Sequence, residues 1–214
     1  MYSTMRNLLI AILALPIFSF GQEVEALNYQ ELVPRQTGMF SVGLRTTLSA
    51  FNGHEEESSG TGIGGQFRLQ FANRVNSDWF FDYITSDIGD YAKRTDYHVG
   101  WSVLFYFTDS PKPKFKPYIL AGHCFDYTKF TDNSSASVRM ERWSSAVQGG
   151  AGVHWNLSSK IDLSFAAQYM LHLGNEIEVE RENGILSFSE HQGASLEGHM
   201  LFHVGINYTI GQLW

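Results

Sequence analysis

Large apolar residues alternate with small or polar ones along much of this chain. In residues 39–51, MFSVGLRTTLSAF, one set contains Phe40 and Leu44 and the other contains Ser41 and Arg45. A period of two places successive side chains on opposite faces of a β-strand. The alternation recurs in residues 62–73, 96–107, 161–173 and 201–214, so these segments predict strands with one apolar and one polar face.

Three further segments, at residues 78–86, 117–127 and 145–155, predict strands with a less regular pattern. The first is apolar on both faces over part of its length, although we expect Asp82 on the polar face. In the second, the alternation does not show which residues belong to which face, and we assign His123 to the polar face and Leu120 to the apolar face. In the third we expect His154 on the polar face. The sequence therefore predicts eight strands.

The connections between these strands alternate in length. Short segments at 73–77, 108–116 and 156–160 alternate with longer ones at 52–61, 87–94, 129–143 and 175–194. Short turns at one rim and long loops at the other are typical of outer-membrane barrels. Aromatic residues near the predicted strand ends are expected to form girdles at the membrane interfaces. They are Phe40, Phe71, Trp79, Phe107, Tyr118, Trp155 and Tyr208.

These patterns predict an all-β fold, an eight-stranded antiparallel up-and-down transmembrane β-barrel. A soluble β-sandwich or a lipocalin-like cup is the alternative. That alternative would place the apolar faces toward a shared interior, where a small barrel has limited room for large side chains. The small and polar residues share one face of each strand, which suits the interior of a narrow barrel, and the bulky apolar set suits lipid.

The first residues have the composition of an export signal. Arg6 precedes an apolar run at residues 8–17, and small residues at 19–21 suit cleavage. The run is shorter than the about 20 apolar residues of a spanning helix. We therefore expect a signal peptide at residues 1–21, a polar lead-in at 22–36, and a barrel at 37–214 in the outer membrane.

Charge and composition argue against a nucleic-acid-binding protein and against a disulfide-stabilised fold. A net charge of −7 at pH 7 disfavours nucleic-acid binding, because phosphate recognition needs a basic face. The single cysteine, Cys124, excludes an intrachain disulfide framework. The expected surroundings are outer-membrane lipid and lipopolysaccharide, and the sequence indicates no cofactor.

From about Thr37 to Trp214 the chain resembles the small eight-stranded outer-membrane barrels of the OmpA-transmembrane-domain and OmpX kind, within the porin-like superfamily. The residues PYILAG at 117–122 and the closing strand carry this resemblance. The residues SFGQ at 19–22 are similar to the signal endings of exported proteins in the Bacteroidota. The resemblance implies recognition of a terminal aromatic residue by the barrel assembly machinery. Trp214 fits that role, although Gln212 interrupts the alternation before it.

The polar set is rich in ionisable residues. Side chains fill an eight-stranded barrel, and buried charges there need opposite partners. We interpret one group as a structural charge network that closes the lumen, with Arg45 and Arg68 as the partners of Asp82. The group comprises Arg45, Arg68, Asp82, Asp96, Asp162, Glu197 and His203.

Three histidines, His98, His172 and His199, are expected near the loop-side rim. With a carboxylate such as Glu197 they are chemically sufficient for zinc, copper or nickel. They lack the tight sequence spacing of known metal motifs, and rim histidines more often form hydrogen bonds with neighbours or water. The sequence alone therefore assigns no metal.

A catalytic site is also left unassigned. Some barrels that this chain resembles modify lipid A, which requires a serine activated by a histidine base or a related His–Asp–Ser arrangement. The candidates are His154 with Ser158 or Ser159, and His98 with Asp96 and Ser102. Neither set matches a catalytic motif, so the sequence favours a protein that is not an enzyme.

Residues 177–191 alternate around Asn183-Gly184, a strong hairpin signal. The pattern predicts a ribbon that projects beyond the membrane and offers an edge to a protein partner. We expect a structural or surface-interaction barrel that acts through its extracellular loops. A narrow porin-like pore is the alternative, and a lipid A-modifying enzyme is the third hypothesis.

Overall fold

The computed structural model describes residues 37–51, 59–110, 113–135, 137–182, 185–195 and 198–214, with the backbone alone for 51 and 175–195. These residues form nine strands. They are β1 (Met39–Phe51), β2 (Gly60–Ala72), β3 (Val75–Ile88), β4 (Ala92–Tyr106), β5 (Phe115–Asp132), β6 (Arg139–Asn156), β7 (Ile161–Glu182), β8 (Ile185–Ser195) and β9 (Gly198–Gln212). No helix in this described part of the chain is long and apolar enough to cross a bilayer.

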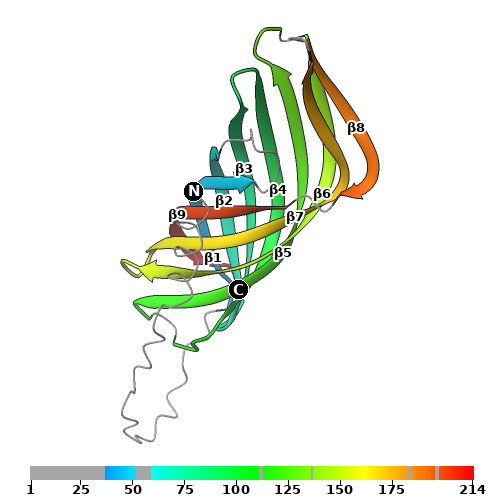
Figure 1. The fold of residues 1–214 in the computed structure, drawn as a ribbon. Coiled ribbons are helices and arrows are strands. Elements are labelled where there is room, and N and C mark those ends of the chain that lie inside the picture. Colours follow the sequence, from blue (N-terminus) through cyan, green and yellow to red (C-terminus); the bar gives the residue numbers. More distant parts are fainter. Residues whose placement is uncertain (1–36, 52–58, 111–112, 136, 183–184, 196–197) are drawn as a thin grey trace, which may run out of the picture. The chain divides into compact units, whose positions relative to one another are not determined.

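Eight of the strands close into an antiparallel barrel (Figure 1). The order runs from β1 through β7 and then to β9, which pairs with β1. The eight-stranded antiparallel barrel predicted from the sequence is therefore confirmed. The ninth strand, β8, pairs with the far part of β7, from Gly174 opposite Ser195 to Glu182 opposite Ile185. It forms the second arm of the hairpin predicted at 177–191.

The outer surface of the barrel is a belt of exposed apolar side chains. Leu44, Ile63 and Phe125 are 70%, 67% and 62% exposed, and Val204 and Ile206 are about half exposed. The period of two produces this belt, because each apolar residue follows one that points into the barrel. A continuous apolar band around a closed barrel is stable against lipid hydrocarbon.

A row of aromatic side chains borders the belt on the loop side. Tyr83, Tyr97, Tyr127 and Trp143 follow one another across β3 to β6, with ring centroids 5.2, 5.8 and 4.7 Å apart. We call these four residues the loop-side aromatic row. Amphipathic rings of this kind concentrate where hydrocarbon meets the polar head groups.

A second group of aromatic side chains lies near the short turns. Phe115 stacks on Trp155 at 5.8 Å. Phe107, the residue that follows β4, is also exposed. Between Phe107 and Tyr97 the chain rises about 33 Å, at about 3.3 Å per residue. A strand tilt of about 40° reduces this to about 25 Å, the height of the apolar band in outer-membrane barrels.

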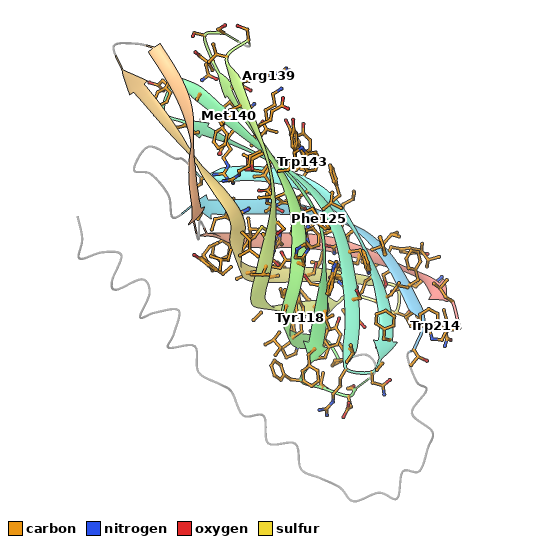
Figure 2. All side chains as sticks on the ribbon, turned by 90° about the vertical axis from the view of Figure 1, so that its right-hand side faces the viewer. Tyr118, Phe125, Arg139, Met140, Trp143 and Trp214 are labelled. Atoms are coloured by element: carbon orange, nitrogen blue, oxygen red, sulfur yellow. The ribbon has the colours of Figure 1, made fainter. Side chains whose placement is uncertain are left out.

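The alternation inverts beyond the loop-side aromatic row. Ile88, Ala92 and Phe130 form a buried apolar cluster there, and Met140 packs against it. The outward positions instead carry charges, at Asp87, Lys93, Lys129, Arg139 and Glu141. Figure 2 shows Arg139 and Met140 beyond Trp143, at the end where β6 begins. Apolar inside and polar outside is the pattern of a sheet in water, so this part of β3 to β6 extends beyond the membrane.

The inversion corrects one expectation from the sequence. The loop expected at 129–143 is mostly strand, because β5 continues to Asp132 and β6 begins at Arg139. The apolar residues of this segment point inward instead of outward. A pattern that predicts a lipid-facing strand therefore fails to identify it.

The orientation expected for the fifth strand is also wrong. Tyr118 and Leu120 point into the barrel and are 3% and 8% exposed. His123 lies on the outside, with its ring 4.9 Å from that of Phe125. The segment 118–125 has apolar side chains on both faces, so its pattern does not define the register, and a slip of one residue exchanges the faces. Asp126 consequently points inward.

Substitution of two neighbouring glycines in β2, Gly64 and Gly65, tests how closely the strands pack. A Cβ atom on the inward-facing Gly64 would overlap the Asp82 carboxylate and the Phe81 carbonyl oxygen, whereas the nearest atom to a Cβ on Gly65 is 3.9 Å away. Gly64→Val should lower the free energy of unfolding by about 1–3 kcal/mol through overpacking. Gly65→Val should change it by about 0.5 kcal/mol or less. Urea unfolding in lipid vesicles measures both, and equal losses would contradict the assigned faces.

Candidate functional site

The interior near the short turns contains a polar cluster around Arg68. Its Nε donates a hydrogen bond to Asp78 at 2.8 Å, and its Nη1 lies 3.4 Å from Asp162. On the other side of the lumen, His154 Nε2 lies 3.0 Å from the hydroxyl of Tyr106. Arg68, Asp162, His154 and Tyr106 line a cavity of about 70 Å³, which has room for a few water molecules.

At mid-height the interior contains one ion pair and an apolar layer. The Arg45 guanidinium makes a two-point contact with the Asp82 carboxylate, through Nε at 2.6 Å and through Nη2. The guanidinium carbon lies 4.1 Å from the centre of the Phe80 ring. Phe80 in turn belongs to a buried apolar cluster with Ile84, Cys124, Ala146, Met170 and Leu201.

Above this layer three histidines from β4, β7 and β9 meet inside the barrel. The ring centroids of His172 and His199 are 4.9 Å apart, and that of His98 lies 5.9 Å from His199 and 6.3 Å from His172. Each of the three is at most 2% exposed. Each histidine occupies an inward-facing position of its strand at a similar height in the barrel, and this brings the three together.

Asp126 on β5 lies between two of these histidines. Its Oδ2 is 3.1 Å from His172 Nδ1, and its Oδ1 is 3.4 Å from His98 Nε2. The Thr128 hydroxyl donates to Asp126 at 3.1 Å, and it lies 2.7 Å from Asp96. We call His98, His172, His199 and Asp126 the histidine cluster.

The structure places the residues of the predicted charge network as follows. Arg45 lies against Asp82, as described, but Arg68 pairs with Asp78 and Asp162 instead of with Asp82. The strand register explains this difference, because Arg68 is opposite Asp78 and Asp82 is opposite Gly64.

The remaining members of the network lie higher in the barrel. Asp96 accepts a hydrogen bond from Arg94 Nε at 3.1 Å. His203 Nδ1 lies 2.9 Å from the Thr47 hydroxyl. Glu197 lies outside the described residues.

Sequence reasoning missed Asp126 and Asp78. Asp126 was missed because the fifth strand was assigned the wrong faces, which placed this carboxylate outside the barrel. Asp78 shares the parity of Asp82 and stands at the start of the predicted third strand. The alternation was therefore sufficient to predict that Asp78 points into the barrel. The inward position of Asp126 could be known only from the strand register.

The candidate catalytic sets do not assemble in the described residues. Ser102 accepts a hydrogen bond from Gln148 at 2.7 Å, and it lies four positions along β4 from His98, about 13 Å away. His154 contacts Tyr106, while the Ser158 hydroxyl accepts backbone hydrogen bonds from Lys160 and Ile161. Within the described part of the chain, no serine–histidine hydrogen bond joins either set.

The mid-height ion pair should dominate the electrostatic part of stability. Asp82→Ala leaves the buried Arg45 without its carboxylate, and we expect a loss of about 3–5 kcal/mol in the free energy of unfolding. Adding Arg45→Met should recover much of this loss, because the unpaired charge is then removed as well. A double-mutant cycle by urea unfolding measures the coupling, and additive losses would contradict it.

A matched control for this cycle lies in the turns outside the membrane. Arg74 and Asp109 also form a two-point pair there, and both are exposed. The hydrogen bond from Arg74 lowers the pKa of the Asp109 carboxyl. Because water screens this pair, Asp109→Ala should leave the unfolding midpoint unchanged.

The fold is similar to those of solved outer-membrane barrels. Neisserial surface protein A matches with a TM-score of 0.60 and 12% identity, over 80% of this chain and 97% of that one. OprG from Pseudomonas aeruginosa matches with a TM-score of 0.55 and 15% identity, over 82% and 97%. A major outer membrane protein from Thermus thermophilus matches with a TM-score of 0.54 and 11% identity, over 80% and 99%. No family model and no curated protein matches the sequence. The chain thus has the fold of the small eight-stranded transmembrane barrels of outer membranes.

Proposed function

We propose that this protein is a closed outer-membrane barrel that acts as a surface-interaction protein through its loop-side end. The filled lumen is the observation that carries the proposal. A protein of this kind needs no water path through the barrel, and its working surface is the part of the strands that extends beyond the membrane.

Side chains occupy the lumen at successive levels. The Arg68 cluster lies near the short turns, and Leu104, Tyr106, Tyr118 and Leu120 form a buried apolar cluster. The Arg45–Asp82 pair and the Phe80 layer follow, and then the histidine cluster. At the loop end Ile88, Ala92 and Phe130 form a further apolar cluster on the inner face of β3 to β5. Two apolar layers between the polar ones oppose the passage of hydrated ions.

The loop-side end offers strand edges to a partner. The pairing of β6 with β7 ends at Ser145 opposite Leu173, while β6 continues to Arg139 and β7 continues to Glu182. Beyond Leu173, β7 pairs with β8 instead. Strand edges of this kind can bind an extended segment of another protein by β-augmentation. Trp143, 77% exposed, lies beside the β6 edge and would add an apolar contact.

Two other functions have less support. A narrow porin-like pore would require a polar path through the two apolar layers. A lipid A-modifying enzyme would require a serine next to an activating histidine, and the described candidates lie apart. Trp214, exposed at the end of the chain near the ring of Phe71, remains our predicted signal for the barrel assembly machinery.

Conductance measurements test the closed lumen. The refolded protein in a planar lipid bilayer should show no steady current steps, because apolar side chains close the lumen. Insertion is checked in parallel by the difference in gel migration between unheated and boiled samples. Phe80→Gly with Leu120→Gly removes bulk from the two layers and is the positive comparison. Steady steps from the wild-type protein would refute the closed lumen and support the pore.

Epitope tags test the location of the working end. A tag inserted between Glu182 and Ile185, at the tip of the β7–β8 hairpin, should bind antibody on intact cells. The same tag between Ser158 and Ser159, in the turn between β6 and β7, should bind only after the outer membrane is permeabilised. Flow cytometry distinguishes the two, and the reverse result would place the hairpin on the periplasmic side.

A further inference from the structure

The histidine cluster has a chemistry that the proposed surface function does not use. Charged groups inside a closed barrel are expected to pair with opposite charges, as Arg45 and Asp82 do. Here one carboxylate, Asp126, faces two imidazoles, and the third imidazole of His199 lies beside them. Imidazole and carboxylate together are preferred ligands of zinc and related transition metals.

From this arrangement we propose that His98, His172, His199 and Asp126 form a transition-metal site for a divalent ion of the zinc class. Two ligands of one tetrahedral zinc ion, each bound at about 2.0–2.1 Å, lie about 3.3 Å apart. The two contacts that Asp126 makes, at 3.1 Å with His172 and 3.4 Å with His98, match this separation. The third histidine ligand would come from His199, whose ring is adjacent to both others.

The rings of His172 and His199 have the spacing of two ligands to one ion. The centre of an imidazole ring lies about 3.2 Å from a zinc ion bound to its nitrogen, so tetrahedral geometry separates two ring centres by about 5 Å. The rings of His172 and His199 are 4.9 Å apart, whereas that of His98 is 5.9 and 6.3 Å from them. Binding would therefore require the ring of His98 to move about 1 Å toward the other two. The Asp96 carboxylate is also near, since one ligand atom each from Asp96, His98 and Asp126 lie within 4.8 Å of one another.

Buried ligand atoms without partners provide a second, independent observation. His98 Nε2 and Asp126 Oδ1 face each other at 3.4 Å, but neither has a hydrogen-bond partner among the described residues, although both residues are fully buried. An unpaired buried polar atom is destabilising. A metal ion bound between these two atoms would compensate this cost. Thr128 and Ser144 already hold the Asp126 carboxylate, at 3.1 and 3.3 Å, as hydrogen-bonding groups commonly hold metal ligands.

The seam between β6 and β7 provides the access path. His172 is opposite Ala146, next to the last β6–β7 pair at Ser145 and Leu173. From there toward the loops, β6 and β7 no longer pair with each other, so the barrel wall opens directly above the cluster. The cluster lies at the level of the loop-side aromatic row, because His98 follows Tyr97 in β4. An ion from the loop side could therefore reach it without crossing the apolar layers.

Zinc binding to the purified, refolded protein tests this site. After treatment with a chelator, isothermal titration calorimetry should show one Zn²⁺ bound per chain with micromolar or tighter affinity. Co²⁺ should give the strong visible absorption of a tetrahedral site. His172→Gln and Asp126→Asn should each weaken Zn²⁺ binding by at least about ten-fold. His123→Gln, on the same strand as Asp126 but facing lipid, should leave the affinity unchanged, as should His154→Gln in the Arg68 cluster.

The overturning results are equally specific. Absence of Zn²⁺ binding to the folded wild-type protein would show that the cluster is only an ion pair and hydrogen-bond network. Equal affinities of His172→Gln and His123→Gln would place the bound zinc elsewhere on the chain. If the lumen variants fail to fold, the Co²⁺ spectrum of the wild-type protein decides, and a weak octahedral spectrum would reject the site. None of these results depends on whether the barrel conducts ions.

Discussion

Backbone hydrogen bonding in lipid is the constraint on which this structure depends. The hydrocarbon layer supplies no water to unpaired N–H and C=O groups, so strands can cross it only as a closed barrel. The pairings of β9 with β1 and of β6 with β7 complete the closure. Where the chain leaves the membrane this requirement ends, and β6 and β7 separate at the same level. The seam and its strand edges follow from the change of solvent.

Closure with eight strands also determines the interior. A barrel of this size leaves space only for side chains, so each inward residue must pack against, or pair with, another inward residue. Charges satisfy this requirement as ion pairs, such as Arg45 with Asp82, and apolar residues satisfy it as the layer around Phe80. In the histidine cluster the described partners leave His98 Nε2 and Asp126 Oδ1 without a hydrogen bond, which supports the metal site proposed above.

The solvent outside the strands decides which face is apolar. Between Phe107 and Tyr97 the outward residues of β4 face lipid and are apolar, whereas Lys93 beyond Tyr97 faces water. On the inner face, Asp82 and His98 lie in the membrane part, and beyond it Ile88 and Phe130 are buried beside Arg94. One strand thus carries two opposite patterns, and the aromatic row marks the position where they meet. The projecting end therefore has its own small apolar core, which orders in water the strands that we propose as a partner surface.

The sequence by itself determined the membrane part of this protein. Alternation between bulky apolar and small polar residues is a local property of each strand, so it identified eight strands, the inward position of Arg45, Asp82 and His98, and the hairpin around residues 183–184. Only the tertiary structure decided three other features. The register of β5 placed Asp126 inside. The sequence could not show this, because residues 118–125 carry apolar side chains on both faces and their alternation does not identify the inward one. The pairing of β2 with β3 assigned Arg68 to Asp78. The sequence had placed His98, His172 and His199 near the same rim, but the distances between them required the closure of the barrel, because it brings together strands that are far apart in sequence.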